Sequence, residues 1–158
     1  MKLINSILKP EIAYAHCDIP CGIYDPHLAQ VAAHTVIRMV NLINNLPNLS
    51  DRENQHKFTR YIAVKEEHAE LVKHEIRVIW GDFLKPEHIK KFPELNDLVW
   101  QIMKLGSQAR QEIDLKIATD LLNAVLRFSE IFWKIKEREP VRVPAPYAGA
   151  GKELILHK

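Results

Sequence analysis

The sequence predicts an all-α protein, an antiparallel four-helix bundle that a short non-helical segment precedes. The first observation is the spacing of apolar residues, which recur at steps of three and four positions over residues 26–139. The second is composition, since only five glycines and few β-branched runs argue against a β-sandwich or barrel. The third is that short connections join the periodic stretches, as in a bundle.

The first two helices have recognisable start and stop signals. Asp25 places a capping acceptor before Pro26, which suits the first position of a helix. Pro47 ends this helix. Ser50 and Glu53 form a capping-box pattern that predicts the start of the second helix. The second helix is expected to end near the Gly81-Asp82 pair.

The later part of the chain predicts two more helices and a tail. The third helix is expected over residues 95–105, because Gly106 and Ser107 follow its apolar positions. The fourth is expected from about residue 110 to 139. Residues 140–158 begin with three prolines and two glycines in twelve positions, so they cannot continue the helix. We expect this tail to be extended or mobile, and to lie on a neighbouring subunit.

Size and charge exclude several classes of protein. A chain of 158 residues fits one domain. The 22 basic residues against 20 acidic ones leave a net charge of +2, too little for a dedicated nucleic-acid binder. No apolar run approaches the roughly 18 residues of a membrane-spanning helix. We therefore expect neither nucleic acid nor a membrane among the partners.

The chemically informative stretch lies ahead of the first helix and holds both cysteines. It reads His16-Cys17-Asp18-Ile19-Pro20-Cys21-Gly22-Ile23-Tyr24-Asp25-Pro26. Two thiols alone would more often be buried apolar groups or a disulfide than metal ligands. Here they lie in a turn with proline and glycine, a histidine adjoins the first of them, and the small residue Ala15 precedes that histidine. These features favour a metal site.

The first fifteen residues read as a leader that is removed inside the cell. Asn5 and Ser6 interrupt its apolar stretch, which is too short for an export signal. Cleavage between Ala15 and His16 would free an α-amine. That amine, the Cys17 backbone nitrogen and two thiolates can then surround a metal in one plane. Square-planar ligation of this kind suits Ni(II) or Cu(II).

At these residues the sequence resembles the nickel-containing superoxide dismutases. Their mature N-terminus is a nickel hook of the form H-C-D-x-P-C-G-x-Y, and every fixed position of it occurs in residues 16–24. The resemblance continues to about residue 138. Further similar residues are Lys65-Glu66-Glu67, Ala69-Glu70-Leu71, Trp80, Lys85-Pro86, Phe92-Pro93-Glu94-Leu95 and Ile131-Phe132-Trp133.

The resemblance implies the activity and the ligands. The family dismutates superoxide to oxygen and hydrogen peroxide by Ni(III)/Ni(II) cycling, with one nickel ion per subunit. By resemblance, His16 supplies its α-amine and an axial imidazole, Cys17 its thiolate and backbone nitrogen, and Cys21 its thiolate. Asp18 is expected to hold the loop through backbone hydrogen bonds, or else to be a solvated acid. Tyr24 is expected to restrict access to the metal, to pack at the helix entry, or both.

One position supports the hook, and three depart from the family pattern. Gly22 is expected to adopt a backbone angle closed to other residues. Family members brace the axial imidazole with a glutamate and an arginine, whose positions here hold Ala32 and His68. His68 is the candidate replacement, with a purely structural histidine as the alternative. A family tyrosine is replaced by Phe83.

The resemblance also implies a homohexamer in which neighbouring subunits wall each hook, with Trp100 and Trp133 as candidate contacts. The poor export signal and the free thiols favour the cytoplasm. The domain plan is then a leader over 1–15, a hook over 16–25, a bundle over 26–139 and the tail. Two alternatives remain: a nickel-binding or trafficking protein without turnover, and a structural bundle whose cysteines form a disulfide.

Overall fold

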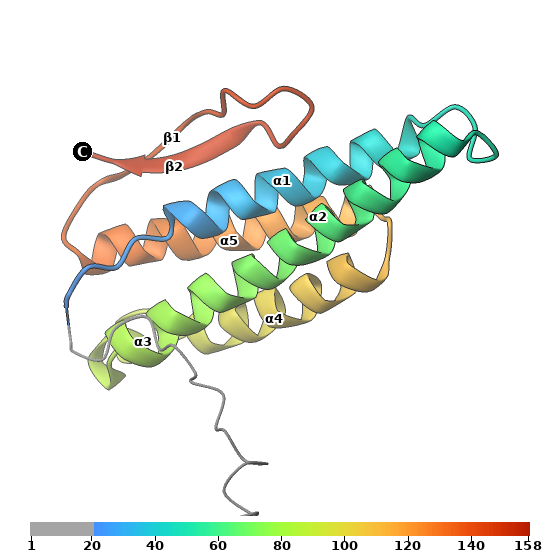
Figure 1. Ribbon diagram of the computed structural model, residues 1–158. Helices are drawn as coiled ribbons and strands as arrows, with labels where there is room; N and C mark the ends of the chain where they lie inside the picture. The colour runs from blue at the N-terminus through green and yellow to red at the C-terminus, as the bar shows by residue number, and fades with distance from the viewer. Residues whose placement is uncertain (1–20) are drawn as a thin grey trace, which may run out of the picture.

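Four long helices form the body of the protein (Figure 1). They are α1 (His27–Asn44), α2 (Arg52–Val78), α4 (Leu95–Gln111) and α5 (Leu115–Ile135). Each packs against its neighbour in this order, and α1 packs against α5, so the four close into an antiparallel bundle. The fold class predicted from the apolar spacing is confirmed. The computed structural model describes residues 21–158, so the leader and the hook positions 16–20 lie outside the described residues.

The connection between α2 and α4 contains two short elements that the sequence did not predict. At its C-terminal end α2 continues into a single π-helical turn, η2 (Ile79–Phe83), and a short helix, α3 (Pro86–Lys91), follows. The helical backbone therefore passes through Gly81 rather than ending there. Single π-turns of this kind frequently occur at functional sites.

Two helix starts are set by aspartates. Asp51, not Ser50, is the N-cap of α2, and its side chain accepts a hydrogen bond from the Asn54 amide at 3.0 Å. Asp114 caps α5 by accepting from the amides of Lys116 and Ile117, and this helix starts later than its apolar spacing suggested. In both places the aspartate satisfies amides that have no partner within the helix.

Helix α4 also runs further than expected, because Gly106 lies inside it rather than after it. A Cβ atom at this position would lie 2.7 Å from the side chain of Lys73 and 3.4 Å from the carbonyl oxygen of Ala69. The glycine thus allows α4 to approach α2 closely. The sequence predicted that Gly106 follows the end of the helix, whereas in the structure Gly106 lies at the contact between α4 and α2.

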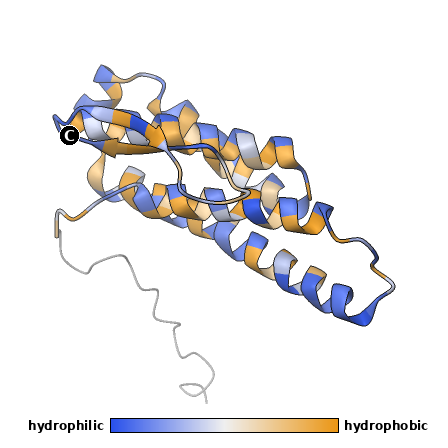
Figure 2. Cartoon of the chain, turned by 90° about the horizontal axis from the view of Figure 1, so that it is seen from above, coloured by the Kyte–Doolittle hydropathy of each residue, from blue (hydrophilic) through white to orange (hydrophobic). Residues whose placement is uncertain are grey.

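The core is built from one apolar stripe on each helix, visible as alternating orange and blue segments in Figure 2. Buried side chains from all four helices meet in one cluster. Its largest fully buried apolar members are Ile76, Ile79, Leu95, Ile102, Leu121, Leu126, Phe128, Ile131, Phe132 and, from the C-terminal segment, Ile155. Among the helices of residues 21–158, none is both long and apolar enough to cross a membrane.

One lysine is part of this interior. The side chain of Lys65 is only 1% exposed, and its Nζ donates to the carbonyls of Ala109, Arg110 and Glu112 at the end of α4. Those carbonyls have no helical partners, and the negative end of the helix dipole favours a cation there. Burial lowers the pKa of Lys65, and the three carbonyls supply the hydrogen bonds that its ammonium group loses to desolvation.

The C-terminal segment folds back as a hairpin instead of remaining a tail. Strands β1 (Pro140–Pro144) and β2 (Glu153–His157) pair antiparallel and lie against α1 and α5 of the same chain (Figure 1). Leu154 and Ile155 are buried there. The predicted tail is therefore a hairpin that covers an apolar surface of its own bundle, and its contact with a neighbouring subunit stays a prediction.

The hairpin also covers the side chain of Trp133. The ring of His157 lies 3.8 Å from the ring of Trp133, measured between centroids, and leaves this indole only 9% exposed. Trp133 is therefore an internal contact, and the prediction that it faces a neighbouring subunit is wrong. Trp100 remains 64% exposed on α4.

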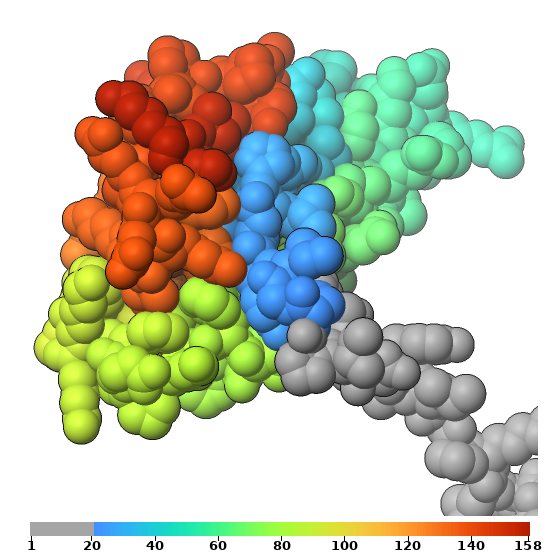
Figure 3. All heavy atoms as spheres, turned by 90° about the vertical axis from the view of Figure 1, so that its left-hand side faces the viewer, coloured from blue at the N-terminus to red at the C-terminus, as the bar shows by residue number. Residues whose placement is uncertain are grey.

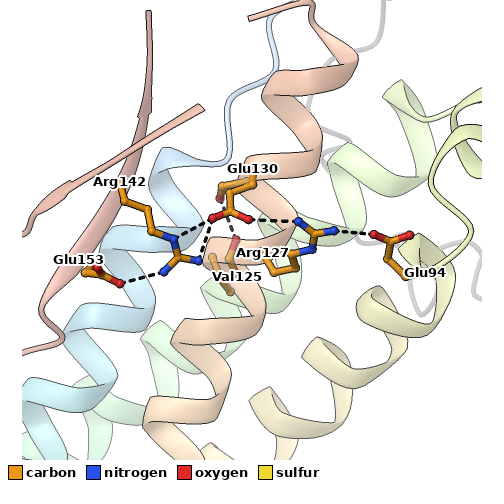
Figure 4. A network of polar contacts seen from close by, with 7 residues as sticks. Glu94, Val125, Arg127, Glu130, Arg142 and Glu153 are labelled. Carbon is orange, nitrogen blue, oxygen red and sulfur yellow. Dashed lines mark hydrogen bonds and ion pairs between the residues drawn. The ribbon is translucent and has the colours of Figure 1, made fainter. Parts of the chain in front are cut away.

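A chain of charged groups ties the hairpin to the bundle (Figure 4). Arg142 of β1 bridges Glu153 of β2 and Glu130 of α5, each at 2.8 Å. Arg127 continues the chain from Glu130 to Glu94 at the start of α4. Single exposed ion pairs contribute about 0–1 kcal/mol, so the value of this network lies in joining four elements at once.

His34 is a buried histidine at the contact between α1 and the hairpin. Its ring is 2% exposed, and Nε2 donates to the carbonyl of Glu153 at 3.0 Å. Nδ1 is then unprotonated in the neutral ring, and no residue of the described part offers it a hydrogen bond. Burial lowers the pKa of His34 more than the bond to Glu153 raises it.

We expect the chain to lose stability as the pH falls below about 6.5, the pKa of an unfolded histidine. The neutral ring contributes its full stability above that pH, because protonation favours the unfolded chain. Urea unfolding followed between about pH 8 and pH 5 should give a steeper loss than the same series on His34→Gln, by at most ~1.4 kcal/mol per pH unit. Equal pH profiles would contradict this role.

Candidate metal-binding site

The described part of the hook lies at the end of the bundle where α1 begins (Figure 3). Gly22 has a φ of 72°, in the left-handed region, so the predicted need for glycine is confirmed. Asp25 accepts a hydrogen bond from the His27 amide at 2.8 Å and so orients the chain as it enters α1. The turn and the cap together set the direction in which the chain leads back from α1 toward Cys21.

Cys21 is the predicted ligand that the structure describes. Its side chain is half-buried, and its sulfur accepts a hydrogen bond from the Ile23 amide at 3.5 Å. An N–H group directed at sulfur favours the thiolate over the thiol. A thiolate is a soft donor of the kind that late transition metals take. The donor chemistry at Cys21 therefore fits nickel.

Tyr24 is seated on an aromatic cluster formed by η2 and α5. Its ring lies 5.5 Å from that of Phe83, and Phe83 lies 5.1 Å from Phe132. His88 stacks on Phe83 at 5.6 Å, and the ammonium group of Lys136 lies 4.7 Å from the Phe83 ring. Packing of Tyr24 at the helix entry, one of its two expected roles, is thus seen. The π-turn supplies the aromatic ring that holds it.

His68 is not part of this cluster. Its Nδ1 lies 2.8 Å from the carbonyl oxygen of Val64 in the same helix, so Nδ1 donates and Nε2 is the acceptor in the neutral ring. It precedes Phe83 by fifteen positions, or about 22 Å of helix at 1.5 Å per residue. Ala32, at the other departure from the family pattern, is buried in the core.

The remaining predicted site residues, His16, Cys17 and Asp18, lie outside the described residues. Within residues 21–158, no group of three or more histidine, cysteine or acidic side chains is placed to hold a metal ion.

A cavity of about 330 Å³ beside the start of α1 was not foreseen. It is lined by residues of the hook end, α1, α5 and β2, namely Asp25, His27, Trp133, Ile155, Leu156 and His157. The sequence signal for it was weak: an apolar Leu154-Ile155-Leu156 run in a segment that otherwise read as a tail. Fold and site together define a helical-bundle protein with its candidate metal-binding segment at one end.

Comparison with known proteins identifies the family. The family model described as nickel-containing superoxide dismutase matches residues 11–136. Superoxide dismutase [Ni] of Streptomyces coelicolor is 33% identical over 136 residues, covering 85% of this chain and 99% of that protein. The enzyme of Streptomyces seoulensis is 32% identical over the same length. A native nickel superoxide dismutase structure superposes with a TM-score of 0.68 and 37% identity, covering 77% of this chain and 99% of that one.

The chain belongs to the nickel-containing superoxide dismutases. It is accordingly an enzyme that acts on superoxide, with nickel as its cofactor.

Proposed function

We propose that this chain dismutates superoxide by Ni(III)/Ni(II) cycling at a hook formed by His16, Cys17 and Cys21. The observation that carries the proposal is the unbroken H-C-D-x-P-C-G-x-Y pattern directly ahead of a bundle of this family. Solved variants of a relative replace a histidine, an aspartate two positions later and a tyrosine six positions after that. His16, Asp18 and Tyr24 have the same spacing.

The ligands are suited to this redox work. Held by these ligands, nickel would supply the one-electron redox chemistry by which two superoxide ions and two protons become oxygen and hydrogen peroxide. Anionic thiolates and an amide nitrogen donate charge, which stabilises the higher oxidation state of a metal. The α-amine of His16 would join them only after the leader is removed, and its imidazole would be a further nitrogen donor.

Other hook residues act on access and position. Tyr24 is held by Phe83, and we propose that its hydroxyl faces the small anion or water that approaches the metal. Asp18 holds the hook turn through backbone hydrogen bonds. Of the two readings of His68, its bond to Val64 in the same helix and its distance of about 22 Å along the helix from Phe83 favour a structural histidine over a brace of the His16 imidazole.

We further propose a cytoplasmic homohexamer, matured by a protease that cuts between Ala15 and His16. Light scattering on the nickel-loaded protein should give the mass of a hexamer. The physical reason is that a nine-residue hook cannot enclose a metal alone, and exposed thiolates are oxidised by peroxide. Exposed apolar residues Ile23, Leu28 and Trp100 are available for such contacts. A fully active monomer would contradict the shared wall, whereas a dimer or trimer would contradict only the hexamer.

Intact-mass and metal analysis, combined with a superoxide assay, tests the function. We expect a mature chain that begins at His16, carries one nickel ion per subunit and consumes superoxide rapidly. Nickel binding without turnover would favour a trafficking protein. A metal-free chain with a Cys17–Cys21 disulfide would favour a structural bundle.

A further inference from the structure

The hairpin lies beyond the part of the chain that matches the family. The match ends at residue 136, and β1 begins at Pro140. The activity shared by the family therefore does not by itself account for the hairpin. Its contacts with α1 indicate what it does in this protein.

Three polar residues on one side of α1 bond to the backbone of the hairpin in register. Gln30 accepts from the amide of Ile155 at 2.7 Å and donates to its carbonyl at 3.0 Å. His34 bonds to the carbonyl of Glu153, and Asn41 bonds to that of Gly149 at 2.9 Å. One step of four residues along the helix is about 6 Å, and two residues of strand are about 6.8 Å. Successive side chains on this side of α1 therefore reach alternate residues of β2.

This register brings the end of β2 to the base of the hook. The Gln30 side chain is fully buried, and both polar ends of its amide are used by Ile155. Two residues further along β2, His157 packs on Trp133 and lines the cavity that also borders Asp25 and His27. In Figure 3 the blue start of α1 lies between the red C-terminal strand and the green segment around η2.

We propose that β2 is a brace that positions the base of the nickel hook. Gln30 is its main attachment, and the contact of His157 with Trp133 is the second. Gln30 stands six positions after Tyr24, so fixing the first turn of α1 fixes the direction from which Cys21 approaches the metal. Gln30 is a positioning residue, since it acts through the backbone of residues 21–26. The expected effect on nickel rests on the proposed function. The expected effect on the backbone of residues 21–26 does not.

The chain offers a matched pair of variants for the test. Gln30→Ala removes the attachment at the hook end, and Asn41→Ala removes the one at the far end of the hairpin, three helical turns away. Each variant removes one attachment between the same hairpin and the same helix and leaves the other in place. A stabilising role alone predicts the same change in nickel retention for the two variants at matched loss of melting temperature, whereas the brace predicts a difference.

The first measurement is nickel dissociation into excess chelator, together with the electron paramagnetic resonance spectrum of the oxidised enzyme. Loss of outer contacts around metal ligands typically costs tenfold or more in affinity. We expect about tenfold faster nickel loss and an altered axial signal for Gln30→Ala, with wild-type behaviour for Asn41→Ala. Equal nickel retention in both variants would overturn the brace.

The second measurement is hydrogen exchange in the metal-free protein, and it does not depend on the proposed function. The amides of Ile23, His27 and Leu28 should exchange faster in Gln30→Ala than in Asn41→Ala. His157→Ala should show the same faster exchange to a smaller extent. It can replace Gln30→Ala in this test if Gln30→Ala folds poorly. Unchanged exchange at these amides in both hook-end variants would contradict the brace even if nickel catalysis is established.

Discussion

Cys17→Ser and Cys21→Ser should each abolish superoxide turnover and leave the helix content unchanged. A serine hydroxyl is a poor donor to nickel and stays protonated, so it cannot stabilise the oxidised metal. We expect a loss of at least about 100-fold in kcat/KM, beyond the usual effect of altering an outer contact. Circular dichroism should match the unchanged protein, because the core is built by the helices from residue 27 onward.

Tyr24→Phe is the matched control for the two cysteine variants. It keeps the ring contact with Phe83 and removes only the hydroxyl, so it should retain nickel. If Cys17→Ser or Cys21→Ser kept full turnover with nickel bound, the thiolate ligand set would be wrong.

A chain that still carries the leader should fold but not turn over superoxide. The peptide bond at His16 converts the α-amine into an amide, which is a much weaker metal ligand. A chain that begins at His16 should regain activity when nickel is supplied. We expect the two to differ by at least about 100-fold in nickel-dependent turnover, with the same melting temperature for the metal-free bundle to within a few degrees.

Full activity of the uncleaved chain would contradict the amine ligand. A second control separates the loss of the free α-amine from the presence of the leader. A chain that begins at His16 but carries an acetylated α-amine should remain inactive. That variant has the mature length, so only the ligand chemistry differs.

The bundle could be predicted from the sequence because the apolar spacing that specifies each helix lies within that helix. Apolar residues at helical spacing define four stripes, and each stripe reappears in the core. Helix ends were predicted less well. Asp51 and Asp114 cap their helices only because the chain turns there, and Gly106 lies inside a helix because α2 passes close to it. Such choices depend on tertiary contacts that a single segment does not contain.

The hairpin could not be predicted from the properties of its own residues. It buries few apolar side chains, and its other partners are polar residues of α1. Gln30 and His34 were the available signal, since they interrupt an otherwise alanine-rich buried face at a spacing of four residues. A buried amide and imidazole require hydrogen-bond partners, and the hairpin backbone supplies them. The same contact explains why Trp133 is internal.

The candidate site was predicted from a different kind of information. The hook was recognised from residue types at fixed positions. Gly22 has the positive φ that this pattern implied, and Tyr24 packs at the helix entry, one of the two roles expected of it. The seat of Tyr24 on Phe83 was not visible, because it depends on the π-turn η2 that brings this ring to the end of the bundle.

Titrating the metal-free chain that begins at His16 with Ni(II), while following the decay of superoxide, tests the central claim most directly. The hook predicts that the decay rate rises in proportion to added nickel and stops rising at one equivalent per subunit. A rate that does not respond to nickel, or that rises equally in Cys21→Ser, would contradict the assignment of catalysis to the hook.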